Sequence, residues 1–360
     1  MKRIIFLLVL VLIILPVHAQ GVREVYQDAP VTVIDSLDRE VTMPALPQRI
    51  VLAGRANLFL ANVLYLFPEA SQRIVALAQT DQGMGSFIPY IDPAYAEKVH
   101  LANQASVEEI ASLAPELVII KDSQYRQLGS QLEQLGIPVI ALRLESYEDY
   151  LYDIGIIGTV LGNAERASYL QKYISDIVSS VQETATRADR TPRTAILYYT
   201  VRDGAAAFNI PPAGWIQTYM VTTVGAEAVW ASSNLTTGWQ TVNFEQIASW
   251  DPDYIFLVTY TFPSREVLPV IEDSAAWRQM RAYRNGEIRA FPGDFNSWAQ
   301  PDMRWLLGLQ WLAHELHPDL HDGRSIEQAV YAFFMDLYGV SEQTVTSQIL
   351  PRIREELPEN

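Results

Sequence analysis

The stretch 107–120, VEEIASLAPELVII, has a counterpart at 244–257, FEQIASWDPDYIFL. The two copies agree at five positions that are each 137 residues apart, so the motif contains no gap. These pairs are Glu108 and Glu245, Ile110 and Ile247, Ala111 and Ala248, Ser112 and Ser249, and Pro115 and Pro252. Helix-turn-strand units can look alike by chance, since proline before an apolar β-rich run is a common helix stop. A duplication of whole lobes explains the spacing better.

The composition is that of a globular protein with room for two domains. The chain has 360 residues, of which 49% are hydrophobic and 19% charged, enough for two separate cores. Its formal net charge is −16, which disfavours nucleic acid and anionic membrane surfaces as partners. An anionic ligand would therefore need arginines placed locally around it.

The first 19 residues have the features of an export signal. Lys2 and Arg3 precede an apolar run over 4–17, and Val17-His18-Ala19 places small residues where a signal peptidase reads. A bare membrane anchor is the alternative, but the run is shorter than the roughly 20 residues that span a bilayer. We therefore predict a signal peptide over 1–19, cleaved near Ala19.

The chain contains no cysteine. This excludes a disulfide framework, a cysteine nucleophile and a thiolate metal site, and it also removes the cysteine that would carry a lipid anchor. We expect the mature chain to be free in the periplasm.

Strand-like and helix-like patterns alternate on both sides of one long helical segment. After a hairpin over 31–43, the β-rich runs RIVLAG (49–54), RIVALAQ (73–79), LVIIKD (117–122) and PVIALR (138–143) are each followed by a helical pattern. This order predicts parallel βαβ units and an N-terminal α/β lobe over 20–146. A proline-free segment predicts a connecting helix over 147–189, although three glycines make a straight rod less certain in its first part.

A second series of strands repeats this order after the connecting helix. TAILYYT (194–200), YIFLVTY (254–260) and EIRAFPG (287–293) predict a C-terminal α/β lobe over 190–322. The repeated motif lies at matching places in the two lobes. We therefore predict an α/β fold of two Rossmann-like lobes joined by one long connecting helix, with a ligand cleft between the lobes.

These features resemble the periplasmic solute-binding proteins that supply iron-siderophore, haem and cobalamin ABC importers. The resemblance rests on the duplicated motif, on WRQMRAYRNGEIRAFPG, and on WAQPDMRWLLGLQWLAHELHPDL as the last helix of the second lobe. It covers roughly residues 30–320 and implies a monomeric protein, without enzymatic activity or a resident cofactor, that binds an iron chelate and passes it to a membrane permease.

The resemblance also implies a role for the repeated glutamates. In this family a surface glutamate on each lobe docks onto basic residues of the permease, and the motif carries this role to Glu108 and Glu245. Exposed carboxylates that face arginines steer and register such an association. They could also be helix-start carboxylates favoured by the helix dipole, and both explanations can hold.

The candidate ligand-binding residues come from loops that follow strands, because ligands of open α/β sheets bind beyond the carboxyl ends of the strands. Aromatic rings and arginines suit a bulky, partly apolar chelate with peripheral negative charge. The predicted residues are Arg55, Thr80, Lys121, Tyr125, Arg202, Trp215, Trp239, Tyr260, Trp298 and Arg304.

Three other functions are alternatives to chelate binding. Some proteins that resemble this family bind molybdate or tungstate, and hydroxyls, amides and one or two cations would hold such an oxyanion. A naked metal ion is disfavoured because the mature chain has only His100, His314, His317 and His321, although His314 and His317 could face one side of a helix. A secreted enzyme is disfavoured because Gly-x-Ser-x-Gly, His-Glu-x-x-His and a phosphate loop are all absent.

A helical extension follows the second lobe, over 323–360. Its apolar residues Phe333, Phe334, Leu337 and Tyr338 form a cluster in the sequence. We expect the extension to pack across the second lobe; a partner-binding helix is the alternative.

Overall fold

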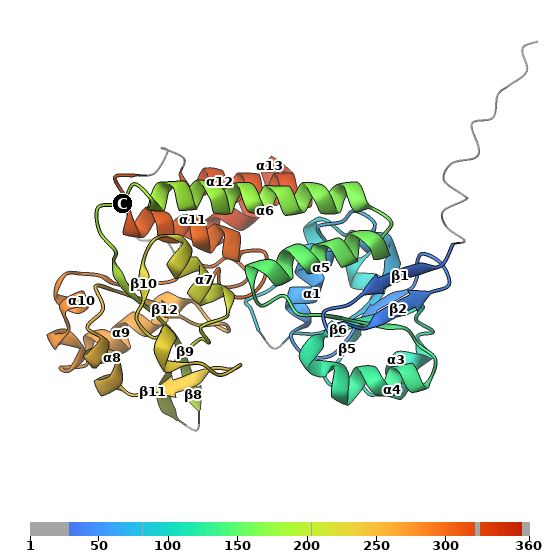
Figure 1. Cartoon of the computed structure of the whole chain (residues 1–360), viewed down its shortest axis with the longest axis horizontal. Helices are drawn as coiled ribbons and strands as arrows, with labels where there is room; N and C mark the ends of the chain where they lie inside the picture. Colours follow the sequence, from blue (N-terminus) through green and yellow to red (C-terminus); the bar gives the residue numbers. More distant parts are fainter. Residues whose placement is uncertain (1–28, 81, 203, 321–324, 355–360) are drawn as a thin grey trace, which may run out of the picture.

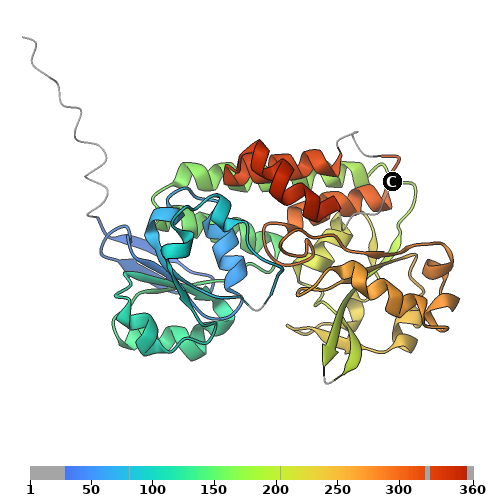
Figure 2. The ribbon, with the colours of Figure 1, turned by 180° about the vertical axis from the view of Figure 1, so that it is seen from behind.

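The computed structural model describes residues 29–80, 82–202, 204–320 and 325–354, apart from the side chain at 202. The predicted signal peptide over 1–19 lies outside the described residues. The chain forms two α/β lobes side by side, with helices running along one side of both (Figures 1 and 2). No described helix is long and apolar enough to cross a membrane.

The first lobe is built on a five-stranded parallel sheet with the order β5-β4-β3-β6-β7. Its strands are β3 (Ile50–Leu52), β4 (Ile74–Ala78), β5 (Val99–Leu101), β6 (Leu117–Lys121) and β7 (Val139–Leu142), beside a hairpin of β1 (Val31–Ile34) and β2 (Glu40–Met43). Its helices are α1 (Asn57–Leu64), α2 (Ala70–Arg73), η1 (Ile88–Tyr90), η2 (Tyr95–Glu97), α3 (Val107–Ser112), η3 (Asp122–Gln124), η4 (Tyr125–Gly129) and α4 (Ser130–Gln134). Strands β3 and β6 in the middle of the sheet and β7 at its edge are buried throughout, as expected for a parallel sheet covered by helices on both faces.

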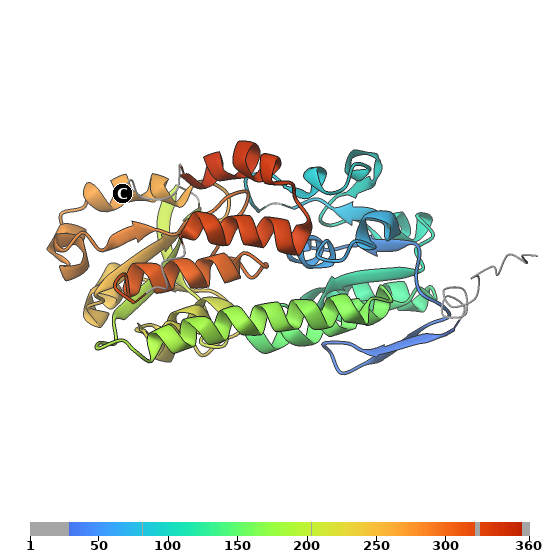
Figure 3. The same cartoon turned by 90° about the horizontal axis from the view of Figure 1, so that it is seen from above.

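The connection between the lobes is two helices, whereas the sequence suggested one over 147–189. Helix α5 (Tyr147–Val160) ends before Gly162, whose φ of +67° is unfavourable for other residues, and α6 (Ala164–Ala185) begins after Asn163. The side chain of Asn163 caps α6 by accepting a hydrogen bond from the backbone N–H of Arg166. Helix α6 alone spans both lobes (Figure 3).

The second lobe has a mixed sheet, in which β11-β9-β8-β12-β13 are neighbours and β10 pairs with β8. Its strands are β8 (Arg193–Arg202), β9 (Ala205–Ile210), β10 (Glu227–Ala228), β11 (Gln240–Val242), β12 (Tyr254–Val258) and β13 (Ile288–Ala290). Its helices are α7 (Ile216–Thr223), η5 (Ala231–Ser233), α8 (Phe244–Trp250), η6 (Ser264–Val267), α9 (Leu268–Glu272), η7 (Trp277–Gln279), α10 (Arg281–Arg284) and α11 (Trp305–Leu316). Strands β9 and β11 run antiparallel to their neighbours, because two residues between β8 and β9 leave no room for a crossover helix.

The C-terminal extension packs on the second lobe, as expected, and also on the first. It consists of α12 (Ile326–Ala332), η8 (Phe333–Leu337), α13 (Glu342–Thr344), η9 (Val345–Ile349) and α14 (Leu350–Arg354). The rings of Phe334 and Tyr338 lie 5.4 and 4.6 Å from Phe87, which belongs to the first lobe. The apolar cluster predicted in this segment is buried.

Candidate functional site

The carboxyl ends of the first sheet's strands face the second lobe. After β4, the backbone N–H of Gly83 donates to the carbonyl of Tyr260 and that of Met84 to the carbonyl of Phe295, each at 2.6 Å. After β7, the carbonyl of Glu145 accepts from the N–H of Ile216 at 2.8 Å. These contacts place the strand-following loops of the first lobe at the boundary between the lobes.

Arg55 lies at the centre of this boundary. Strand β3, which it follows, has β4 on one side and β6 on the other, so Arg55 lies at the switch point where α/β proteins bind ligands. Gly54 and Ala56 have φ of +82° and +58°, which turn the chain sharply there. The Arg55 side chain is exposed, and no hydrogen bond or ion pair joins it to any other residue that the structure describes.

Four aromatic rings of the second lobe lie together and form what we call the aromatic platform: Tyr198, Trp215, Trp239 and Tyr260. Tyr198 stacks on Tyr260 with ring centroids 4.5 Å apart and lies 4.8 Å from Trp239. Trp215 meets Trp239 edge to face at 5.5 Å. Tyr260 is buried beneath, whereas the other three rings are half-buried. The platform thus leaves aromatic surface open to an occupant.

Sequence reasoning did not select Tyr198. Alternate residues of a strand point to opposite faces, and the neighbouring Tyr199 faces Phe208 instead, at 5.5 Å. Two adjacent tyrosines look equivalent in the sequence. The pairing of β8 with its neighbours β9 and β12 places Tyr198 in the platform and Tyr199 opposite Phe208.

A buried asparagine fixes the loops that carry the two tryptophans. Asn234 Nδ2 donates to the carbonyls of Ile210 and Gly238, each at 3.0 Å. The carbonyl of Asn234 accepts from the N–H of Ala213 at 3.1 Å. Asn234 therefore joins the segment just before Trp215 to the segment just before Trp239.

Lys121 lies at the boundary but is not free. Its ammonium is buried, 2.8 Å from Glu145 Oε1, and also donates to the carbonyl of Arg143. Burial raises the pKa of Glu145, although the nearby charge of Lys121 acts in the opposite direction. This partly buried ion pair joins the end of β6 to the loop that contacts Ile216.

Of three further predicted residues, Tyr125 packs within the first lobe, Thr80 bonds within its own loop, and Arg202 has no described side chain. Tyr125 Oη donates to Glu133 at 2.7 Å, and the guanidinium of Arg39 lies 3.7 Å from its ring centroid, so Tyr125 packs within the first lobe. Thr80 is exposed and its hydroxyl accepts from the N–H of Gln82. The side chain of Arg202 lies outside the described part of the chain.

Trp298 and Arg304 are fully buried, which differs from the cleft positions that we expected for them. Arg304 Nε lies 2.5 Å from Asp294 Oδ1, and its Nη1 lies 3.2 Å from Asp302. Burial lowers the pKa of Arg304, but Asp294 and Asp302 outweigh this and raise it overall. Trp298 Nε1 donates to Asp294 at 3.4 Å. Both side chains thus have partners inside the protein and present no surface to a ligand.

Glu108 and Glu245 occupy equivalent positions in the two lobes. Each is the second residue of its helix, α3 or α8, and the side chain of the capping residue, Ser106 or Asn243, accepts from the third N–H of the helix. Both glutamates are exposed, and neither forms an ion pair with another described residue. Figure 1 places α3 and α8 on the side of the two lobes away from α6.

A metal site within the protein has no support among the described residues. They contain no group of three or more histidine, aspartate or glutamate side chains that could hold a metal ion. His317 of the predicted pair is buried, and its Nε2 lies 2.7 Å from the carbonyl oxygen of Val224.

Comparison with known proteins agrees with this architecture. The chain is 23% identical over 334 residues to the molybdate-binding protein MolA of Haemophilus influenzae, which covers 86% of this chain and 91% of that protein. It is 25% identical over 298 residues to the cobalamin-binding protein of Halobacterium salinarum, covering 80% of this chain and 74% of that protein. The fold is similar to that of a periplasmic solute-binding protein from Veillonella parvula, with a TM-score of 0.70, 19% identity and coverage of 91% and 98% of the two chains.

The profile of the periplasmic binding protein family matches residues 69–294. This match extends from the first lobe across α6 to the end of the last strand of the second lobe. It therefore includes parts of both lobes and more than half of the chain. The chain belongs to the periplasmic binding protein family and is the solute-binding component of an ABC transporter.

Proposed function

We propose that this protein captures a bulky, partly apolar metal chelate, such as a ferric siderophore, haem or a corrinoid, and delivers it to a membrane permease. The observation that carries this proposal is the aromatic platform with its three half-buried rings. Tyr260 of the platform, and Ile216 next to Trp215, bond through their backbones to the first lobe. Aromatic rings offer large contact areas at low cost in conformational entropy.

Arg55 supplies the complementary charge. Its guanidinium is exposed. Its loop belongs to the first lobe and lies at the centre of the boundary with the second lobe. A guanidinium recognises carboxylate-like oxygens through paired hydrogen bonds. An apolar surface on one side and one arginine on the other suit a ligand with an apolar body and negative groups at its periphery.

Delivery to the permease is proposed to use Glu108 and Glu245. Both are exposed, lie on the same side of the two lobes and have no ion-pair partner among the described residues. Two carboxylates held at a fixed separation, one on each lobe, can orient the whole protein on a basic surface of the permease.

Molybdate or tungstate is the second candidate ligand. It is favoured by the relative that is named a molybdate-binding protein, and by two buried donors at the lobe boundary. Tyr150 Oη of α5 and Trp305 Nε1 of α11 have no hydrogen-bond partner among the described residues, and their rings lie 5.9 Å apart.

The charges around these donors favour the chelate over the oxyanion. Burial raises the pKa of Tyr150, and the carboxylates of Asp302 and Glu145 raise it further. These acidic side chains are close enough to oppose a small dianion placed there. Burial raises the pKa of Tyr260, the buried ring of the platform, and Glu145 and Asp302 raise it further. The rings, however, would contact the apolar body of a chelate and not its negative groups.

Native mass spectrometry of the mature chain, residues 20–360, tests the proposal. The protein is mixed separately with haem, several ferric siderophores, cobalamin, molybdate and tungstate. A one-to-one complex with one of the chelates at submicromolar concentration is the expected result. Binding of molybdate or tungstate alone would overturn it in favour of the second candidate.

A further inference from the structure

Phe87 is the point where the first lobe, the second lobe and the C-terminal extension meet. It follows β4 and is fully buried. Its ring centroid lies 6.5 Å from that of Phe295 in the second lobe, and it meets Phe334 and Tyr338 of the extension edge to face. Edge-to-face pairs are favourable and depend on geometry, so Phe87 links the relative positions of three parts of the chain.

The extension, residues 325–354, which we call the clasp, is also hydrogen-bonded to the first lobe. Tyr338 Oη donates to the carbonyl of Asn62 in α1 at 2.9 Å. Arg166, near the start of α6, donates through Nη2 to the carbonyl of Leu337 and through Nε to the carbonyl of Leu66 at 2.9 Å. The bonds of Tyr338 to Asn62 and of Arg166 to Leu337 join the clasp to the first lobe. A shift of the clasp would break both bonds and leave their polar groups without these partners.

The clasp contacts the second lobe through two arginines. The guanidinium of Arg352 in α14 lies 4.4 Å from the ring centroid of Phe295. The guanidinium of Arg304 lies 4.8 Å from Phe87 and 5.8 Å from Phe334. Asp302, which binds Arg304, also accepts from Asn62 Nδ2 at 2.9 Å. The buried charges of the second lobe thus bond directly to α1 of the first.

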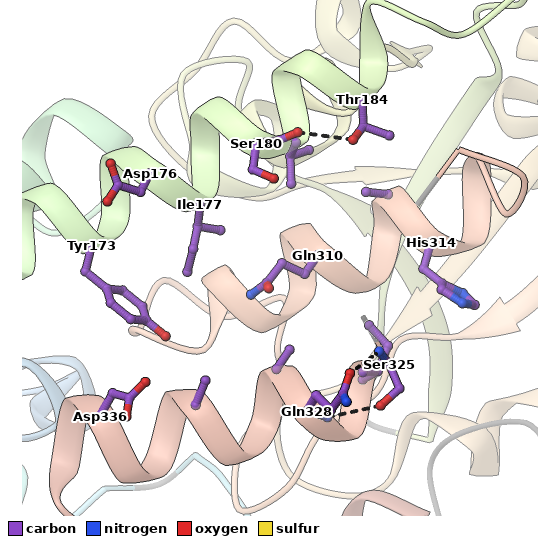
Figure 4. Close-up of a pocket in the computed structure, with 15 residues that line it drawn as sticks. Tyr173, Asp176, Ile177, Ser180, Thr184, Gln310, His314, Ser325, Gln328 and Asp336 are labelled. Atoms are coloured by element: carbon purple, nitrogen blue, oxygen red, sulfur yellow. Dashed lines mark hydrogen bonds between the residues drawn. The ribbon is translucent and has the colours of Figure 1, made fainter. Parts of the chain in front are cut away.

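Residues 333–338 of the clasp make its contacts with Phe87, Asn62 and Arg166 of the first lobe and α6. A groove of about 910 Å³ separates α12 from α6, above α11. Figure 4 shows Tyr173, Ile177 and Ser180 of α6 on one side of this groove and Gln328 and Asp336 on the other. Helix α12 therefore does not pack closely along α6, and the contacts of 333–338 with Phe87, Asn62 and Arg166 secure the clasp to the first lobe.

We propose that the clasp is a second tether between the lobes, which restricts how far they separate and along which edge. The clasp and α6 lie on the same side of the molecule (Figures 1 and 3). With both connections on one side, the lobes pivot about that side and separate at the opposite side, which carries α3 and α8. Two tethers permit a smaller range of interlobe angles than α6 alone.

The absence of cysteine makes a direct test possible, because spin labels attach only to introduced cysteines. Ser112→Cys and Ser249→Cys place one label on α3 and one on α8, at equivalent exposed positions of the repeated motif. Pulsed electron paramagnetic resonance then measures the distance distribution between the labels in the ligand-free mature chain. This measurement requires neither ligand nor permease, so it is independent of the proposed function.

Three variants are compared in this labelled background. Phe334→Ala removes a ring that contacts Phe87, and Tyr338→Phe removes only the hydroxyl that binds Asn62. Met335→Ala is the matched control, because Met335 is on the same turn but is 37% exposed. Circular dichroism confirms that each variant is folded.

The parent and Met335→Ala are expected to give one narrow distribution of the distance between the two spin labels. Phe334→Ala and, to a smaller extent, Tyr338→Phe are expected to broaden it and add a population at longer distance. Should Phe334→Ala fail to fold, Tyr338→Phe alone decides. The parent distribution in every folded clasp variant would overturn the proposal.

Discussion

At the residue scale, two arginines that look alike in the sequence have opposite roles. Arg55 and Arg304 both follow a strand-like run and both suggested ligand contact. The structure leaves Arg55 exposed and pairs Arg304 with Asp294 and Asp302. Sequence could not separate them, because the carboxylates that bind Arg304 become its neighbours only when the last loop folds back onto α11.

Arg55→Ala is expected to weaken binding of a carboxylate-bearing chelate. A hydrogen bond to a charged group contributes about 1.5–3 kcal/mol, so the affinity should fall by at least roughly tenfold. Isothermal titration calorimetry measures the loss, and Arg278→Ala, an exposed arginine of η7, is the control. Equal affinities of Arg55→Ala and the parent would remove Arg55 from the site.

Gly83→Ala is expected to disrupt the contact between the lobes. An added Cβ would lie 2.1 Å from Asn296 Oδ1, and the φ of Gly83 is +87°. Strained backbone of this kind costs about 1–3 kcal/mol, and the clash adds to it. Urea unfolding compares this variant with Gly136→Ala, which has a φ of +78° and no atom near its added Cβ. If both lose the same free energy of unfolding, the contact with Asn296 is unimportant.

At the scale of elements, the sequence predicted the order of strands and helices but not their registers and breaks. The apolar runs of β6 and β12 were evident because they are buried throughout. The choice of Tyr198 over Tyr199 depends on the pairing of β8 with β12, and the break between α5 and α6 depends on the cap at Asn163. Both are details that periodicity alone does not resolve.

Asn234→Ala is expected to loosen the aromatic platform. It leaves the buried carbonyl of Ile210 without this side-chain donor, which costs about 1–3 kcal/mol, and it removes one of the two side-chain donors to the carbonyl of Gly238. Chelate affinity and the free energy of unfolding should both fall. Leu235→Ala, which changes an 80% exposed side chain of the same loop, is the control. Unchanged chelate affinity in Asn234→Ala would show that this loop does not position the platform.

At the scale of the whole molecule, the duplication visible in the sequence corresponds to two lobes with equivalent capped helices at Glu108 and Glu245. The presence of a second, similar lobe was therefore predictable from the sequence. The role of the C-terminal extension was not, because its apolar residues indicate burial but not against which lobe. Phe87, its main contact in the first lobe, lies in a loop that has no distinguishing pattern.

Reversing both docking glutamates tests the proposed delivery step. Glu108→Arg with Glu245→Arg is expected to abolish transport into vesicles that contain the cognate permease, because it replaces attraction by repulsion. Chelate affinity should stay unchanged, since both residues lie on the outer side of the lobes. Glu109→Arg, a neighbouring exposed position, is the control. An equal fall in chelate affinity would contradict the docking assignment.

The most direct test of the central claim is the chelate affinity of a variant that lacks the open half of the platform. Tyr198→Ala with Trp239→Ala removes two half-buried rings at the lobe boundary, and calorimetry compares it with Tyr169→Ala, an exposed ring on α6. The platform variant is expected to lose at least roughly a hundredfold in chelate affinity, and the control none. Parent affinity in a folded platform variant would contradict the claim that the ligand rests on these rings.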